Sequence, residues 1–405
     1  MRRFYEDVIA DHLAQYEQMV FISGPRQSGK TTVTQNVAEK YGSSSYFNWD
    51  NVEHRETLLS GYEALLKNTD APILGRKKKQ LPLIIFDEIH KYKTWKSYLK
   101  GFFDTYKTRT RSVVTGSAKL NIYKRGGDSL MGRYFLYRMH PLSLREVIGG
   151  KRGQTMIAPP KKPEKELMDL LLEFGGFPEP FLKQSKSFYN RWQNLRGEQL
   201  IREDLQAIAR VAEIHQFELL SRLVAASAAQ LVSYESLARK IRISEPTVRR
   251  WLGSLEILYH CFFLTPWTNN IERSLLKMPK LYSMDWSLVA DKGARYENFV
   301  AAHLLKAVDY WNDSGQGKFA LHFIRDKEGR EVDFAVIKDR RVWFLVEVKA
   351  SHKEPLSKHL FYYQQKIKAE HAFQVVFDLP FVAEDCFAET SPVIVPASTF
   401  LSQLV

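Results

Sequence analysis

The first third of the chain alternates short apolar runs with stretches whose apolar residues recur at helical spacing. Four of the apolar runs have the length of buried strands, and they lie at residues 19–23, 44–48, 81–86 and 112–115. Helical patterns cover residues 31–41, 50–67 and 95–106. Strands that alternate with helices in this way predict a parallel α/β sheet.

The rest of the chain has a different pattern. Residues 149–163 place glycines and prolines among lysines, which predicts a linker. Residues 164–284 have mainly helical patterns, whereas the last part mixes a helix at 295–308 with strands and turns. A length of 405 residues suits two or three domains. We therefore expect a multidomain α/β protein with domains at residues 1–150, 151–284 and 285–405.

A glycine-bearing turn follows the first predicted strand. It has the sequence GPRQSGKT and matches the pattern G-x-x-x-x-G-K-[ST] between a strand and a helix. Its glycines allow the backbone N–H groups to surround a phosphate, and the following helix presents its positive end. Lys30 is expected to reach the β and γ phosphates of ATP, and Thr31 to bind Mg²⁺. The predicted nucleotide contacts are Gly24, Pro25, Arg26, Gln27, Ser28, Gly29, Lys30, Thr31 and Thr32.

Two carboxylates end the apolar run LIIFDE. In a parallel sheet, Asp87 at the carboxyl end of its strand lies next to the phosphate loop and is expected to hold Mg²⁺. Glu88 is expected to orient or deprotonate the attacking water. Together with the loop, this pair predicts hydrolysis rather than binding alone.

Further groups are candidates for contacts with the γ-phosphate. The strand at 112–115 ends in hydroxyl residues, and its spacing does not choose between Thr115 and Ser117. Arg133 is the first candidate for an arginine that stabilises the transferred phosphate, in cis or from a neighbouring subunit. Arg125 and Arg138 are alternatives.

The middle region contains a helix-turn-helix pattern. Ser233 and Ser244 are positioned to cap two successive helices, and an apolar run at 259–264 could form a wing strand. One interpretation is a winged helix that contacts DNA through Arg249 and Arg250. The alternative is a winged helix that serves as a lid or spacer, with both arginines facing water.

The C-terminal region contains two strand patterns, at 330–337 and 342–349. With a turn centred near residue 340, Asp333 and Glu347 fall opposite each other, where Cβ atoms are about 4.5–5.5 Å apart. Both could bind one Mg²⁺ or Mn²⁺ with Glu297, and Lys349 could activate a water that attacks a phosphodiester. The alternative is an ordinary hairpin with solvated charges, although charges within an apolar run are costly unless paired.

Charge and composition narrow the choice of partner and compartment. The net charge is +13, and residues 1–150 hold 24 Lys and Arg against 15 Asp and Glu. An acidic partner is therefore expected, with DNA favoured over RNA, although a merely solvated surface is the alternative. Two cysteines exclude a disulfide framework. The sequence has neither the pattern of a signal peptide nor a long apolar run, so we expect a cytoplasmic protein without a membrane span.

Several segments together resemble a known family. They are GPRQSGKT, LIIFDEIHK, VVTGSAK, GRYFLYRMHPLSLREV, EVDF and VEVKAS. The chain resembles, over nearly its whole length, prokaryotic AAA-type ATPases with a C-terminal domain of uncharacterised function that is similar to PD-(D/E)XK nucleases. The resemblance implies a P-loop AAA domain, a winged helix and a nuclease-like domain, in that order. It also implies the nucleotide roles of Lys30, Thr31, Asp87 and Glu88, a place for Arg133, and a nuclease pattern formed by Glu297, Asp333, Glu347 and Lys349.

Three functions are consistent with these patterns. The first is a Mg²⁺-dependent ATPase, expected to be a homo-oligomer, that acts on or near nucleic acid. The second is a DNA or RNA nuclease gated by ATP. The third is a nucleotide-dependent switch that binds a protein partner and cleaves nothing.

Overall fold

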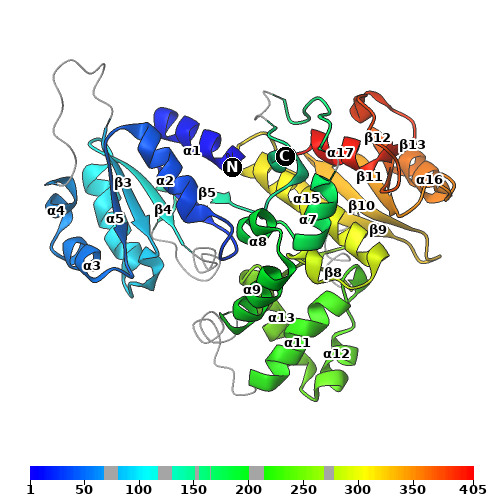
Figure 1. Cartoon of the computed structure of the whole chain (residues 1–405), viewed down its shortest axis with the longest axis horizontal. Helices are drawn as coiled ribbons and strands as arrows, with labels where there is room; N and C mark the ends of the chain where they lie inside the picture. Colours follow the sequence, from blue (N-terminus) through cyan, green and yellow to red (C-terminus); the bar gives the residue numbers. More distant parts are fainter. Residues whose placement is uncertain (68–80, 117–129, 151–154, 165, 200–213, 269–277) are drawn as a thin grey trace. The chain divides into compact units, whose positions relative to one another are not determined.

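The computed structural model of the chain describes all residues except 68–80, 117–129, 151–154, 165, 200–213 and 269–277. Two compact units divide the chain after His140, at Met1–His140 and Pro141–Val405 (Figure 1). Within the described residues, no helix is both long enough and apolar enough to span a bilayer.

The first unit is built on a five-stranded parallel sheet. Its strands are β1 (Met19–Ser23), β2 (Ser44–Asn48), β3 (Leu83–Asp87), β4 (Arg111–Thr115) and β5 (Tyr134–Arg138). Their order is β2-β3-β4-β1-β5, and all four neighbouring pairs are parallel. The sheet predicted from the alternating pattern is therefore confirmed. Strand β5 is an addition at the edge that the pattern did not predict.

Helices lie on both faces of this sheet (Figure 1). They are α1 (Phe4–Gln15), α2 (Lys30–Tyr41), α3 (Val52–Leu59), α4 (Tyr62–Lys67) and α5 (Trp95–Tyr106), with the short 3-10 helix η1 (Ile89–Lys91) after β3. The single helix expected at 50–67 is two helices, because the chain turns at Gly61 with a φ of 114°. Helix α1 was not predicted.

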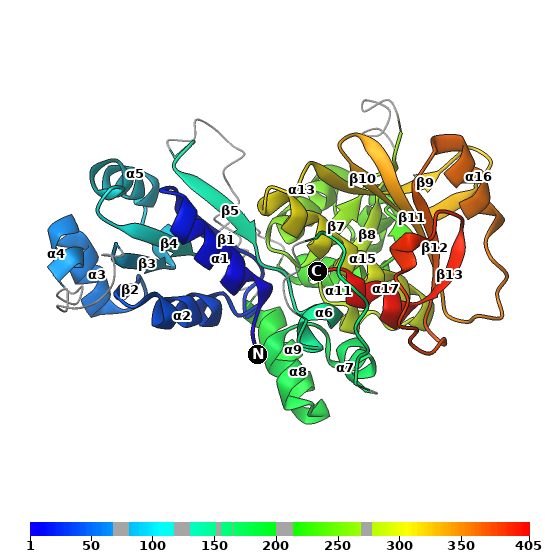
Figure 2. The ribbon, with the colours of Figure 1, turned by 90° about the horizontal axis from the view of Figure 1, so that it is seen from above.

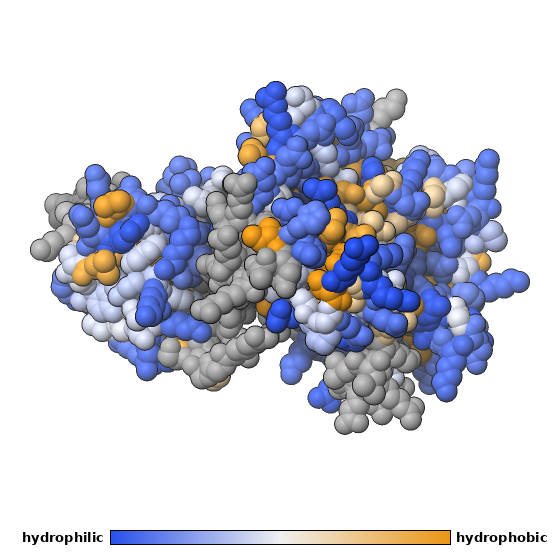
Figure 3. Space-filling view, turned by 90° about the horizontal axis from the view of Figure 1, so that it is seen from below, coloured by the Kyte–Doolittle hydropathy of each residue, from blue (hydrophilic) through white to orange (hydrophobic). Residues whose placement is uncertain are grey.

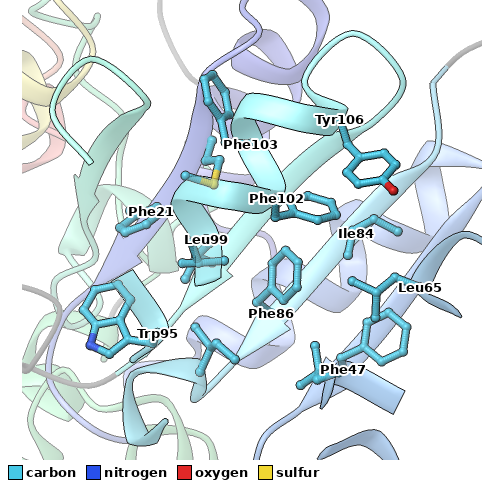
Figure 4. Packing of buried hydrophobic residues seen from close by; sticks show 14 of the residues in the cluster. Phe21, Phe47, Leu65, Ile84, Phe86, Trp95, Leu99, Phe102, Phe103 and Tyr106 are labelled. Carbon is cyan, nitrogen blue, oxygen red and sulfur yellow. The ribbon is translucent and has the colours of Figure 1, made fainter. Parts of the chain in front are cut away.

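The aromatic side of α5 forms the core against one face of the sheet (Figure 4). Phe102 stacks on Tyr106 and meets Phe86 of β3 edge to face, with ring centroids 5.2 Å apart. Burying a side chain of this size contributes roughly 1.5–3 kcal/mol. On the face shown in Figure 3, the first unit exposes apolar residues only in small groups, consistent with a core that collects most of them.

The second unit begins with short helices and a small sheet. Its first helices are α6 (Leu144–Val147), α7 (Leu167–Phe174), α8 (Pro178–Lys183) and α9 (Lys186–Gln199). They are followed by α11 (Ile214–Ala226), β6 (Gln230–Leu231), α12 (Tyr234–Ile241), α13 (Glu245–Ile257), β7 (Cys261–Leu264) and β8 (Lys280–Ser283). The antiparallel sheet has the order β6-β8-β7. Ser233 and Ser244 cap α12 and α13 as predicted, and β7 occupies the expected wing position. The name winged helix itself stays a prediction.

A second sheet, which is mixed, forms the end of the chain (Figure 2). Its elements are η4 (Trp286–Leu288), α15 (Lys292–Asp313), β9 (Phe319–Arg325), β10 (Glu331–Lys338), β11 (Arg341–Lys349), α16 (Lys358–Ile367), β12 (His371–Val376), η5 (Cys386–Ala388), β13 (Val393–Pro396) and α17 (Ala397–Gln403). The order is β13-β12-β11-β10-β9, antiparallel from β9 to β11 and parallel from β11 to β13. Leu360 and Tyr363 of α16 pack on one face of it. The later part is thus α/β, as expected.

The hairpin between β10 and β11 has the register that the sequence predicts. Phe334 pairs with Val346 and Ala335 with Leu345, so the same register sets Asp333 opposite Glu347. Asp339 and Arg340 form the turn with φ angles of 47° and 71°, the left-handed conformation that a tight two-residue hairpin turn requires. An irregularity between Val336 and Ile337 absorbs the offset of the turn.

The boundary between the units lies at His140, before the expected boundary at residue 150. Hydrogen bonds and an ion pair between buried groups attach residues 141–148 to the second unit. Lys306 of α15 donates to the carbonyl of Pro141 (2.9 Å) and pairs with Glu146. Burial lowers the pKa of His303 to about 3, so its neutral ring accepts the N–H of Leu144 at 2.9 Å. The predicted linker is bound as well, because Arg145 donates to the Pro159 carbonyl.

Candidate functional site

The phosphate loop leaves β1 at Gly24 and enters α2 at Lys30. Gly24 has a φ of 147° and Gly29 a φ of 92°, angles that favour glycine. A Cβ on Gly24 would collide with the carbonyl oxygen of Met139, just beyond β5. The glycine at this position is therefore required by both the conformation of the turn and the close approach of another backbone.

Lys30 extends its ammonium group into the loop. Its Nζ donates to the carbonyl oxygens of Gly24 (3.0 Å) and Pro25 (2.7 Å), and the side chain is buried. The hydroxyl of Ser28 is also buried and makes no hydrogen bond with any described residue. A charged donor and an unused hydroxyl inside one turn fit the binding of an anion, as the sequence predicts.

Asp87 lies at the centre of a set of hydroxyl groups. Thr31 Oγ1 donates to its Oδ2 at 3.2 Å, and the hydroxyls of Tyr46 and Thr115 donate to the same carboxylate. These donors come from the start of α2, the middle of β2 and the end of β4, so three elements converge on the end of β3. Thr31 and Asp87, the two residues predicted to hold Mg²⁺, are thus adjacent, and their oxygen atoms suit that ion.

The hydroxyls of Thr115 and Tyr46 concern the choice of γ-phosphate sensor and a residue that the sequence did not predict. The Thr115 hydroxyl, one candidate for sensing the γ-phosphate, is engaged by Asp87, and the other candidate, Ser117, lies outside the described residues. Tyr46 was missed, because a tyrosine in a predicted strand carries no signal for a role beside a carboxylate. Burial and the contact with Asp87 raise the pKa of Tyr46, so its hydroxyl stays a donor.

Glu88 has a left-handed backbone conformation, with φ 55° and ψ 18°. Its N–H donates to the carbonyl of Thr115 at 3.1 Å. Non-glycine residues in this region are uncommon and concentrate at functional sites. Its Oε2 lies 3.4 Å from Lys91 Nζ. Burial raises the pKa of Glu88, although Lys91 acts in the opposite direction, and a raised pKa suits a base that takes a proton near neutral pH.

Arg3 is a residue of this site that sequence reasoning missed. It is buried at the start of α1, where it donates to the carbonyls of Ser28 (2.8 Å) and His140 (2.6 Å). Glu6 on the same helix accepts from Asn36 and Lys40 of α2. Helix α1 thus holds the phosphate loop against the chain that follows β5.

Arg133 and Arg138, the two candidate arginines among the described residues, lie at opposite ends of β5. The carbonyl of Arg133 accepts the N–H of Met19 at the start of β1. The phosphate loop begins after the other end of β1, roughly 16 Å away at about 3.3 Å per residue. Arg133 also pairs with Asp104 through two hydrogen bonds of 2.7 and 3.0 Å. Action on the phosphates of its own loop is therefore not supported, which leaves action on a neighbouring subunit. Arg138 of β5 pairs with Ser23 of β1, the residue directly before the phosphate loop. Arg125 lies outside the described residues.

The C-terminal carboxylates do come together, but with a lysine among them. Lys280 Nζ of β8 lies 3.1 Å from Glu297 Oε1, 2.5 Å from Glu331 Oε1 and 3.7 Å from Asp333 Oδ1. Glu347 and Lys349 are paired with each other at 3.1 Å. Sequence reasoning did not predict the part played by Lys280 or Glu331.

These groups do not fit a divalent metal ion as they are arranged. Among the described residues, no group of three or more His, Cys, Asp or Glu side chains is arranged to hold one. Burial and the neighbouring Glu297 raise the pKa of Asp333. The metal site stays a prediction without support from this geometry.

The two candidate DNA-contacting arginines of α13 differ in their surroundings. Arg249 donates to Glu245 at 2.6 Å and lies over the ring of Tyr234 at 3.9 Å. Both Arg249 and Arg250 are exposed. Contact of this helix pair with DNA stays a prediction.

One family model matches most of the first unit. Residues 16–148 match the sequence model of the AAA domain. Residues 165–293 match one domain of unknown function, DUF8612, and residues 292–379 another, DUF4143.

Relatives and structural neighbours are distant. The chain is 24% identical over 338 residues to the uncharacterized protein Rv2008c of Mycobacterium tuberculosis and, equally, to Mb2031c of Mycobacterium bovis, covering 78% of this chain and 70% of theirs. The Walker-type ATPase PABY2304 of Pyrococcus abyssi has a TM-score of 0.43 at 15% identity, covering 72% of this chain and 94% of its own. DnaA from Aquifex aeolicus bound to AMPPCP has a TM-score of 0.31 at 16% identity, covering 62% and 86%. The match over residues 16–148, together with the parallel sheet and its phosphate loop, supports an AAA-type ATPase with a P-loop core in this part of the chain.

Proposed function

We propose that the first unit binds ATP with Mg²⁺ and hydrolyses it. One observation supports this more than any other: Lys30, Asp87 and Glu88 meet at the carboxyl edge of one parallel sheet. Ligands bind in α/β sheets at that edge, and these three residue types are the ones that phosphoryl transfer uses.

Each residue has a role that follows from its place. Lys30 exchanges the carbonyls of Gly24 and Pro25 for phosphate oxygens, which are stronger acceptors for an ammonium group. Thr31 and Asp87 hold Mg²⁺, which neutralises phosphate charge when bound. Glu88 accepts the proton of the attacking water, and Lys91 holds its carboxylate in place.

The test of this proposal is ATP turnover with controlled magnesium. We expect purified full-length protein to release inorganic phosphate from ATP with Mg²⁺, and EDTA to slow the release by at least about 100-fold, since a catalytic metal contributes several kcal/mol. Added Mg²⁺ should restore the rate. Absence of turnover, or turnover unaffected by EDTA, would contradict the proposal.

Arg138 is the arginine that we propose acts on the phosphates of its own subunit. Its register with Ser23 brings it to the edge where the phosphate loop begins. We expect Arg138→Ala to lower ATP turnover about 10- to 100-fold, because a charge-assisted contact contributes roughly 1.5–3 kcal/mol. The measurement is the steady-state rate over a range of protein concentrations.

Arg133→Ala is the matched variant for this measurement. Its arginine is paired with Asp104 at the other end of the sheet, so dilute protein should keep its rate within about twofold. A loss confined to concentrated protein would indicate that Arg133 acts across a subunit interface. Equal losses in both variants at every dilution would remove the distinction between them.

We also propose nucleic acid, DNA before RNA, as the partner of the basic part of the chain. The net charge of +13 supports this, and residues 1–150 contribute most of the basic excess. Because Arg249 is engaged by Glu245, we propose contacts with the backbone of the nucleic acid rather than with its bases. The homo-oligomer, the protein partner and the cytoplasmic location stay predictions.

A further inference from the structure

Lys280 is a buried lysine inside a group of carboxylates. Only 4% of its surface is exposed, and its ammonium lies within 4 Å of oxygens from Glu297, Glu331 and Asp333. Its ammonium therefore lies beside Glu297 and Asp333, two of the residues that the sequence predicts as metal ligands.

Protein donors engage one oxygen of each predicted metal ligand. Glu297 Oε1 accepts from both Lys280 and Tyr282, the latter at 2.8 Å. Asp333 Oδ2 accepts the N–H of Val348 at 2.8 Å. Glu347 Oε1 pairs with the ammonium of Lys349. The other oxygen of Glu347, Oε2, is buried and has no hydrogen-bond partner among the described residues. Glu297 Oε2 and Asp333 Oδ1 accept no hydrogen bond from a described residue either, so what disfavours a metal ion is the position of the Lys280 ammonium beside Glu297 and Asp333.

Strand β8 supplies this cation from outside the predicted nuclease-like domain. Lys280 and Tyr282 are two residues apart on the same side of β8, and both contact Glu297 of α15. Strand β8 is the middle strand of its sheet, paired with β6 on one side and β7 on the other. Withdrawal of Lys280 would require a strand bound on both edges to move.

We infer that the ammonium of Lys280 permanently takes the place of a divalent metal ion among Glu297, Glu331 and Asp333. A divalent ion cannot occupy this position while the ammonium fills it, because both would use the same carboxylate oxygens. The cluster is then an internal ion network that joins β8 to α15 and β10. A metal ion held by Glu297 and Asp333 at this position is consequently not part of any cleavage of phosphodiesters by the C-terminal sheet, whatever the ATPase activity of the first unit.

The first test uses Mn²⁺ as the probe on full-length protein without nucleotide. We expect calorimetric titration with Mn²⁺ to give the same result for wild type and for Asp333→Asn, because Asp333 binds no metal. Neither protein should show a saturable site that depends on this residue. A saturable Mn²⁺ site in the wild type that disappears in Asp333→Asn would overturn the inference.

The second test asks whether the cluster binds metal once the ammonium is removed. Lys280→Met should lower the melting temperature by roughly 10 °C, because it leaves buried carboxylates without a cation. Mn²⁺ should raise the melting temperature of Lys280→Met relative to EDTA and leave that of the wild type unchanged. Lys353→Met, at an exposed position, should melt like the wild type.

A double variant covers the case in which Lys280→Met does not fold. Lys280→Met with Glu297→Gln removes one positive and one negative charge together, and it should melt closer to the wild type than the single variant. A single variant as stable as the wild type, or a wild type whose melting temperature rises with Mn²⁺ only while Asp333 is present, would contradict the proposed role of Lys280.

Discussion

Replacement of Lys30 by alanine is expected to weaken ATP binding about 100-fold and to slow turnover about 1,000-fold. The ammonium is buried in the loop, held by the carbonyls of Gly24 and Pro25. Without it, the phosphates lose their strongest donor in a place that water does not easily reach. Truncating one partner of a buried charge pair costs about 2–5 kcal/mol, the range that these losses require. Calorimetric titration with ATP and steady-state phosphate release measure the two effects.

Lys100→Ala is the matched control for this variant. It removes the same charge from an exposed position on α5, so both the affinity for ATP and the rate should remain at wild-type values. Unchanged binding in Lys30→Ala, with the fold intact by circular dichroism, would show that the loop does not hold the phosphates. The assignment of the ATP site would then be wrong.

The sequence predicts the positions of the phosphate loop and of Asp87 because their signals are local. The phosphate loop is one continuous turn whose pattern of glycines, Lys30 and Thr31 reflects the requirements of a phosphate. Asp87 is found because an apolar strand of a parallel sheet ends at the same edge as the loop. The register that sets Asp333 opposite Glu347 is likewise local, since it depends only on the centre of one hairpin turn.

Contacts between distant segments are the part that the sequence hides. Arg3 binds backbone carbonyls of Ser28 and His140, and a backbone partner leaves no pattern in the side chains. Tyr46 reaches Asp87 only because β2 and β3 are neighbours in the sheet. Strands β5 and β2 are both partly buried edge strands, and only β2 was predicted, so an edge position alone gives a weak signal.

In the C-terminal cluster, a contact from a distant segment was also missed, and it changes the interpretation of the predicted metal site. Glu297, Asp333 and Glu347 were correctly expected to be near each other, and that spacing alone favours a metal ion. Lys280 comes from a strand 17 residues before Glu297 in a separate small sheet, so the pattern in the tail could not reveal it. A cluster of acids in a sequence indicates that some cation is present, but not which one.

Replacement of Glu88 by glutamine is expected to preserve ATP binding and to lower turnover about 1,000-fold. The amide has nearly the same shape and can still occupy the turn between β3 and η1, whose backbone is fixed by the bond to the Thr115 carbonyl. It cannot accept the proton of the attacking water, and general bases contribute about 10²–10⁴-fold. ATP affinity by calorimetry and phosphate release in single-turnover reactions separate binding from chemistry.

The pH dependence gives this variant a signature that a structural defect would lack. A base must be deprotonated to act, so wild-type turnover should fall as the pH falls through the pKa of Glu88, which burial raises above its ordinary value. In Glu88→Gln, the slow residual turnover should lose that acid-side decline. Glu53→Gln, exposed on α3, should keep both the rate and the profile of the wild type. If Glu88→Gln hydrolyses ATP at the rate of Glu53→Gln, another group accepts the proton, and the strained turn at Glu88 has a different purpose.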